Sequence, residues 1–427
     1  MNHSGKIDQD DIVRAQVMLL ASGRRTPHEE VDAYRVLAQV SPVAYLPRLV
    51  LALQRLSYNS GSGERHPACL ALCEEAVAAA RAIDPVEPAR ADLLYGALDT
   101  CQRELYTLGR RAEGLAMRAE MLAIGRAQAE LSRDPEVKGL RGWAAGLSED
   151  GRYVEAADAL TELVEAILPH GPGDGGLAWS LLEWIAALDD AGRSGEAIGA
   201  FEKLVGMQAV EASNDRGPMA CHLYSLIGYA QMLDTCGRGE QAATVRQEAL
   251  ALLTELAATG ERKSWSGYQA SYWAVLLPFS GADSERLTSG GPCPPSGAAP
   301  MQWSPDAKRH YFDSRITLRE DVGALVSRAT RDPDQYLAEL VRVHRVLTVR
   351  SAVYWEHRTH LFAERVRPLF DDGVELARQL CQHDPADGTR TLAEILIDRS
   401  TFHTATGEFE AALDDFRQAL SYLGEDS

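Results

Sequence analysis

The chain has 427 residues, of which 45% are hydrophobic and 25% charged, and its formal net charge at pH 7 is −19. This length fits one long repeat array or two to three globular domains, and the apolar content is enough for a large core. The acidic balance argues against nonspecific binding to nucleic acid or to an anionic membrane surface.

The cysteine pattern and the N-terminal sequence favour a cytoplasmic location. The seven cysteines are odd in number and scattered, which argues against a disulfide framework. The first residues lack the apolar segment of a signal peptide, and no run approaches the roughly 18 apolar residues that a membrane helix needs. We therefore expect a cytoplasmic protein that does not enter a membrane.

The N-terminal part of the chain is predicted to form helices over 10–22, 27–40, from 41 onwards, and over 67–83. The third of these opens with Pro42, Tyr45 and Leu46, and the same spacing returns at Pro333, Tyr336 and Leu337. The two ends of the chain therefore carry the same divergent type of helical hairpin. No stretch shows the alternating pattern of a strand.

A repeat follows, built around five glycines. Each has a leucine eleven residues before it, and four of the five have a second leucine four residues before it. Each of the last four has an alanine five residues after it. The glycines are Gly109, Gly151, Gly192, Gly237 and Gly407, and the first four are 42, 41 and 45 residues apart. A fixed period of this length is typical of solenoid proteins.

The spacing has a direct physical interpretation. Leucines seven apart, such as Leu181 and Leu188, lie on one face of a helix. The glycine that follows can adopt a left-handed conformation and end that helix. A small residue such as Ala197 then allows a second helix to pack closely. Each unit is a hairpin that cannot bury its apolar face alone, so neighbours must stack.

The segments 179–201 and 407–416 carry the large–small–glycine–alanine–aromatic order of the tetratricopeptide repeat, which they resemble. The usual period of that repeat is about 34 residues. The longer period here is similar to the long-helix variant found in kinesin light chains and in bacterial signalling proteins. The resemblance implies an all-α, right-handed solenoid whose first helices line a concave groove.

Four regions are expected. Residues 1–94 form degenerate helical repeats, 95–278 form the regular array, 279–305 form a linker or loop rich in proline and glycine, and 306–427 form further repeats. We expect the linker, over 283–300, to be exposed and easily cleaved, because its composition cannot bury enough apolar area to become ordered.

The resemblance also places candidate ligand-binding residues on the groove. Aromatic and arginine side chains are good interface anchors. The groove residues are Arg103, Tyr106, Lys138, Arg141, Trp179, Glu183, Tyr224 and Gln231. A basic stretch over 341–368, which includes Arg342 and Arg345, could extend a preference for acidic peptides. The simpler interpretation of that stretch is a face paired with acidic neighbouring helices, and Trp179 and Tyr224 could equally pack between helices.

Three other motifs have simpler explanations. The glycines over 171–176 match a dinucleotide-binding spacing, but a helix precedes them where a strand is needed. His66, Cys69 and Cys73 share one helix face without a fourth metal ligand nearby, which favours packing at a helix interface. His357, His360 and Glu364 could also share a face, and a structural cluster is the favoured interpretation. No metal, cofactor or catalytic residue is therefore expected.

The leading hypothesis is a non-catalytic scaffold that binds a protein or peptide, with acidic character favoured, in its groove. One alternative is a regulatory or sensor subunit of a bacterial signalling or defence effector. Another is an enzyme with an unrecognised site, although no nucleophile–base or metal motif supports it.

Overall fold

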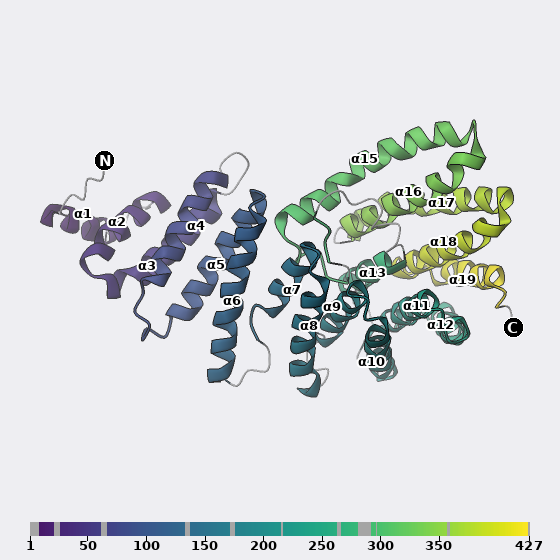
Figure 1. Ribbon diagram of the computed structural model, residues 1–427, viewed down its shortest axis with the longest axis horizontal. Coiled ribbons are helices and arrows are strands. Elements are labelled where there is room, and N and C mark those ends of the chain that lie inside the picture. Colours follow the sequence, from purple (N-terminus) through teal and green to yellow (C-terminus); the bar gives the residue numbers. More distant parts are fainter. Residues whose placement is uncertain are drawn as a thin grey trace. The chain divides into compact units, whose positions relative to one another are not determined.

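A computed structural model describes residues 8–20, 26–60, 66–132, 137–170, 176–214, 217–262, 266–280, 292–295, 297–356 and 359–425. The described residues form 18 α-helices and no strand, so the expected all-α class is confirmed (Figure 1). Contacts divide the chain into two compact units: residues 1–146 with 304–306, and residues 147–303 with 307–427. One division falls between residues 146 and 147, and residues 304–306, at the end of the stretch where the composition suggested a boundary, are grouped with the first unit.

The first unit is a series of helices in which each packs on the next. Its helices are α1 (Gln9–Leu20), α2 (Pro27–Val40), α3 (Pro42–Ser60), α4 (His66–Arg81), α5 (Arg90–Thr107), α6 (Arg111–Ser132) and the first part of α7 (Leu140–Glu149). Residues such as Leu53, Val77 and Leu98 form its continuous apolar core. Cys69 and Cys73 are buried here, and His66 bonds to Glu104 at 2.9 Å.

The second unit holds the remaining helices. They are α8 (Tyr153–Ile167), the short helix η2 (Leu168–His170), α9 (Gly176–Asp190), α10 (Ser194–Ser213), α11 (Met219–Thr235), α12 (Gly239–Thr259), α13 (Ser266–Ser280), α15 (Pro305–Ala329), α16 (Pro333–Trp355), α17 (Thr359–His383), α18 (Pro385–Ala405) and α19 (Phe409–Leu423). The first two residues of α15 belong to the first unit.

The five repeat glycines all end helices, as the spacing predicts. Their φ angles are 75° at Gly109 and Gly151, 73° at Gly192 and Gly237, and 79° at Gly407. At Gly192 the next amide, from Arg193, donates to the carbonyl of Leu188 at 2.8 Å, and the same bond recurs at the other four turns. This is the Schellman arrangement, in which the residue four positions before the glycine supplies the carbonyl.

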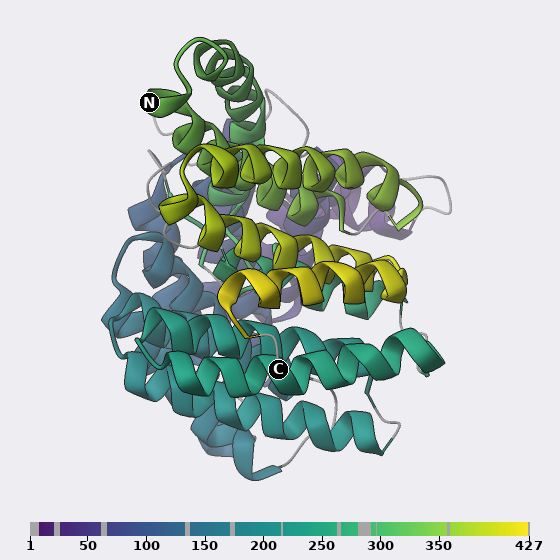
Figure 2. The same ribbon diagram turned by 90° about the vertical axis from the view of Figure 1, so that its right-hand side faces the viewer.

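Packing in the second unit is not only sequential. Helix α13 contacts α11, α16 and α18, and α19 contacts α12. Figure 2 shows the yellow C-terminal helices beside the teal α11 and α12. The last hairpin, α18–α19, therefore packs against a hairpin formed about 170 residues earlier in the chain.

Helix α13 is the centre of this unit because it is apolar on every side, which fits a helix buried all round. Trp273 is 1% exposed, and its ring lies 5.4 to 6.2 Å from those of Phe362, Phe370 and Phe402. Its indole nitrogen donates to Thr401 at 2.8 Å, so this polar group is satisfied in the core.

The prediction of an exposed linker is wrong for the residues described between 292 and 300. Pro294, Gly297 and Ala298 are buried. Gly297 has φ 72°, and a Cβ there would lie 2.5 Å from the carbonyl oxygen of Leu182 in α9. The segment is ordered because glycine allows this close backbone approach, which supplies the contacts that composition alone did not suggest. Residues 281–291 lie outside the described part.

Candidate functional site

In the first unit, the predicted groove residues do not form one surface. Arg103 is exposed and pairs with Asp99 at 3.2 Å. Lys138 lies over the Tyr95 ring at 4.3 Å, and Arg141 is half-buried. Tyr106, in contrast, is fully buried. Its proposed role as a ligand contact is therefore wrong, because it packs in the core.

In the second unit, the first helices of the repeats are covered on both sides. Tyr224 of α11 is 2% exposed and Glu183 of α9 is 6% exposed, so neither offers a surface to a ligand. Burial raises the pKa of the Tyr224 hydroxyl well above its ordinary value. Trp179 is half-buried, with its ring edge-on to Tyr272 of α13 at 5.6 Å. The expected groove is filled here by α13 and the segment around Gly297, which no local pattern could indicate.

Two arginines of the basic stretch in α16 and α17, Arg345 and Arg367, pair with acidic residues. The Arg345 side chain is only 10% exposed, and it donates to Asp398 at 2.8 Å and to Glu394 at 2.7 Å. Arg342 is half-buried on the same helix. Burial raises the pKa of the Asp398 carboxyl, and the opposing influence of Arg345 is smaller. The interpretation of a face paired with acidic neighbours fits these contacts.

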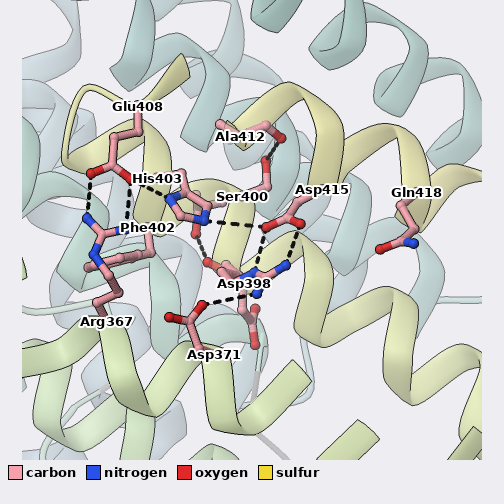
Figure 3. Close-up of polar contacts among 12 residues, drawn as sticks. Arg367, Asp371, Asp398, Ser400, Phe402, His403, Glu408, Ala412, Asp415 and Gln418 are labelled. Carbon is pink, nitrogen blue, oxygen red and sulfur yellow. Dashed lines mark hydrogen bonds and ion pairs between the residues drawn. The ribbon is translucent and has the colours of Figure 1, made fainter. Parts of the chain in front are cut away.

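A network of charges also surrounds the last turn, where the repeat has His403 in place of leucine and Glu408 in place of arginine. Arg367 donates to both oxygens of Glu408, and His403 bonds to Glu408 at 2.9 Å (Figure 3). Arg399 forms two bonds of 2.7 Å to Asp415. These side chains pair with one another, so the network joins α17, α18 and α19.

One opening within the second unit is a cavity of about 490 Å³ between hairpins α11–α12 and α18–α19. Its volume lies in the range of ligand pockets, about 300–1,000 Å³. Gln231 is the one predicted groove residue that lines it. Buried Ala230, Ile397 and Phe416 form part of the wall, while Thr235 and Arg390 are exposed at the rim.

Arg246 of α12 is the most buried charge on this cavity, with its side chain 7% exposed. It donates to Asp234 at 2.5 Å and to both carboxylate oxygens of Glu425. The pKa of Arg246 is raised: burial alone would lower it, but the hydrogen bonds to Glu425 and Asp234 outweigh burial. We call the cavity and this arginine cluster the hairpin cavity.

The sequence around Arg246 indicates a charge on the apolar face of a helix, although the repeat spacing does not. In α12, Ala242, Val245, Ala249 and Leu253 are buried and mark the apolar face of the helix. Arg246 lies within that face, and a charge at such a position must find a partner in the fold. The identity of that partner could not be read from the sequence, because Glu425 follows 179 positions later.

The part of the chain that the structure describes holds no metal-binding cluster. No group of three or more histidine, cysteine, aspartate or glutamate side chains there could hold a metal ion. The glycines at 171–175, His357 and the side chain of His360 lie outside the described residues. No helix among the described residues is long and apolar enough to cross a membrane.

Comparisons with known proteins add no relative. No protein-family model matches the chain, and no curated protein sequence matches it. The hairpin cavity is therefore the feature on which a functional argument can be built.

Proposed function

We propose that this protein is a non-catalytic binding protein of the α-solenoid type, related to tetratricopeptide-repeat scaffolds, whose hairpin cavity holds a peptide segment of a protein partner. The observation that carries the proposal is the cavity of about 490 Å³ between two hairpins distant in sequence. It replaces the concave groove that the repeat pattern suggested.

The lining of the cavity suits a peptide better than a purely apolar ligand. Its wall combines polar and apolar side chains. Phe279, Phe416 and Tyr422 supply aromatic surface, and Gln231 and Thr389 supply hydrogen-bonding groups. Peptides need both, since their side chains are anchored in apolar pockets while their backbone requires donors and acceptors.

The experiment is a selection of peptides from a random display library on the wild-type protein, followed by binding measurements with two variants. Gln231→Trp fills the cavity, while Glu248→Trp places the same ring on the exposed side of α12. Selected peptides should lose at least roughly tenfold in affinity for Gln231→Trp, since an anchor pocket is worth more than about 1.4 kcal/mol.

The Glu248→Trp variant shows whether a loss of binding comes from the cavity or from adding a tryptophan anywhere on the protein. Binding to Glu248→Trp should equal binding to wild type, and both variants should keep the wild-type circular dichroism spectrum. Equal affinity for Gln231→Trp and wild type, or the absence of any enriched peptide, would refute the proposal.

A further inference from the structure

Arg246 bonds to two carboxylates, one from a residue within a helix and one from a residue outside any helix. Asp234 lies inside α11, where the helix fixes its backbone. Glu425 lies beyond the end of α19 at Leu423, after Gly424, whose φ of 73° turns the chain back toward α12. Of the two partners, Glu425 is the one outside any helix, and moving it would leave the helices packed.

Among the described residues, two further hydrogen bonds hold Glu425, both through its backbone. Its amide donates to the carbonyl of Leu420 at 3.0 Å, and its own carbonyl accepts from Gln247 at 3.0 Å. Arginine binds carboxylates through two parallel hydrogen bonds, and the Arg246–Glu425 pair has this form. Any other carboxylate reaching Arg246 could make the same two bonds.

The charges on the cavity wall allow such an exchange. The lining includes Asp234, Glu394 and Glu425 against Arg246 and Arg390, an excess of one negative charge. With Glu425 withdrawn, the lining would be neutral, and an incoming carboxylate would restore the present balance. Without any second carboxylate, Asp234 would still balance the charge of Arg246, but the buried N–H groups that now bond to Glu425 would lose their partners, which is costly.

We propose that Arg246 is the anchor for a ligand carboxylate, supplied by an acidic side chain or a free chain end of the bound peptide, and that Glu425 occupies this anchor when the ligand is absent. The inference rests on the proposed function and specifies its ligand. Binding exchanges one carboxylate for another at the same guanidinium group.

The test removes the internal carboxylate and offers a small one in its place. In the full-length Glu425→Ala variant, sodium acetate should raise the melting temperature more than sodium chloride at equal ionic strength, by about 2–4 °C at roughly 100 mM. In wild type the acetate-specific rise should be much smaller, because Glu425 competes. In Glu425→Ala/Arg246→Gln it should vanish.

A matched pair elsewhere supplies the control. Arg367 also binds both oxygens of a glutamate, Glu408, but neither residue lines the hairpin cavity. Glu408→Ala should show a smaller acetate-specific rise, because the Arg367 side chain is 34% exposed and solvent weakens its ion pairs, whereas the Arg246 side chain is 7% exposed. An equal response of acetate and chloride in Glu425→Ala, or an equal acetate effect in Glu408→Ala, would overturn the inference.

Two further measurements keep the result interpretable. If Glu425→Ala does not fold, Glu425→Gln keeps the side-chain shape, and the same acetate comparison applies to it. The proposed function and the carboxylate anchor can fail independently. If peptide binding depended on Gln231 but not on Arg246, the cavity would still be the binding site and only the carboxylate anchor would be refuted.

Discussion

The guanidinium group of Arg246 in α12 donates hydrogen bonds to both side-chain oxygens of Glu425, which lies 179 positions later in the chain. The contact accompanies the packing of α19 on α12. The last hairpin is thereby joined to an earlier one, and the hairpin cavity lies between them. A stack in which each repeat touched only its neighbours would have no such enclosed space.

Replacing Gly297 by alanine should destabilise the second unit, because the new Cβ would lie 2.5 Å from the Leu182 carbonyl oxygen. Gly192 is the control: its φ is 73°, and nothing lies within 4 Å of a Cβ built there. Both variants carry the cost of a residue with positive φ, about 1–2 kcal/mol.

Gly297→Ala should lose about 1–3 kcal/mol more than Gly192→Ala, as overpacking does. Urea denaturation followed by circular dichroism gives both values. If the two variants were equally stable, the segment around Gly297 would not be docked on α9.

Trp273 should be among the most sensitive core positions, because it is buried against three phenylalanines and bonded to Thr401. Trp273→Ala should lower the free energy of unfolding by about 3–5 kcal/mol. Val210→Ala, at a position 57% exposed in the same unit, should change it by less than about 0.5 kcal/mol. Similar losses in the two variants would contradict the central position of α13.

Part of this fold was predictable from the sequence. The turns at Gly109, Gly151, Gly192, Gly237 and Gly407 depend on residues within a dozen positions of each other, so local spacing was enough to place them. The cover over α9 and α11 was not predictable. It comes from α13, which packs on α11, and from the segment around Gly297, which approaches Leu182 of α9. Composition indicates a loop without showing what that loop contacts.

The candidate site was predictable to a smaller extent. Gln231 was assigned from the repeat register, and it does line the hairpin cavity. Tyr106 and Tyr224 shared that register, but they are buried. The opposite wall comes from α18 and α19, and the sequence holds no local signal that these helices pack beside α11 and α12.

The stability contribution of Glu408 should depend on pH. Its pKa is lowered from 4.5, first by the hydrogen bond from Arg367, then by bonding to His403, against the opposing effect of burial. Because the pKa is lower in the folded state, the ionised carboxylate stabilises the folded protein above about pH 4.5. This stabilisation is lost as the pH falls through the folded-state pKa. Glu408→Gln should therefore melt below wild type at pH 7.

The difference should be modest, at most about 1 kcal/mol, because the Glu408 side chain is 40% exposed. It should be smaller at pH 3, because the wild-type protein loses this contribution as the pH falls below about 4.5. Glu410→Gln, at an exposed position of the same helix turn, should show a smaller effect at pH 7. An equal difference between Glu408→Gln and wild type at both pH values would contradict the assignment.

The hairpin cavity as a ligand site is tested most directly by photocrosslinking. p-Benzoylphenylalanine is placed at position 389, in the cavity wall, or at position 417, exposed on α19. A peptide selected by display is then irradiated with each protein, and the adduct is measured by mass spectrometry. We expect an adduct at position 389, lost when unlabelled peptide competes, and none above background at 417. Equal labelling at the two positions, or labelling only at 417, would contradict the hairpin cavity as the peptide site.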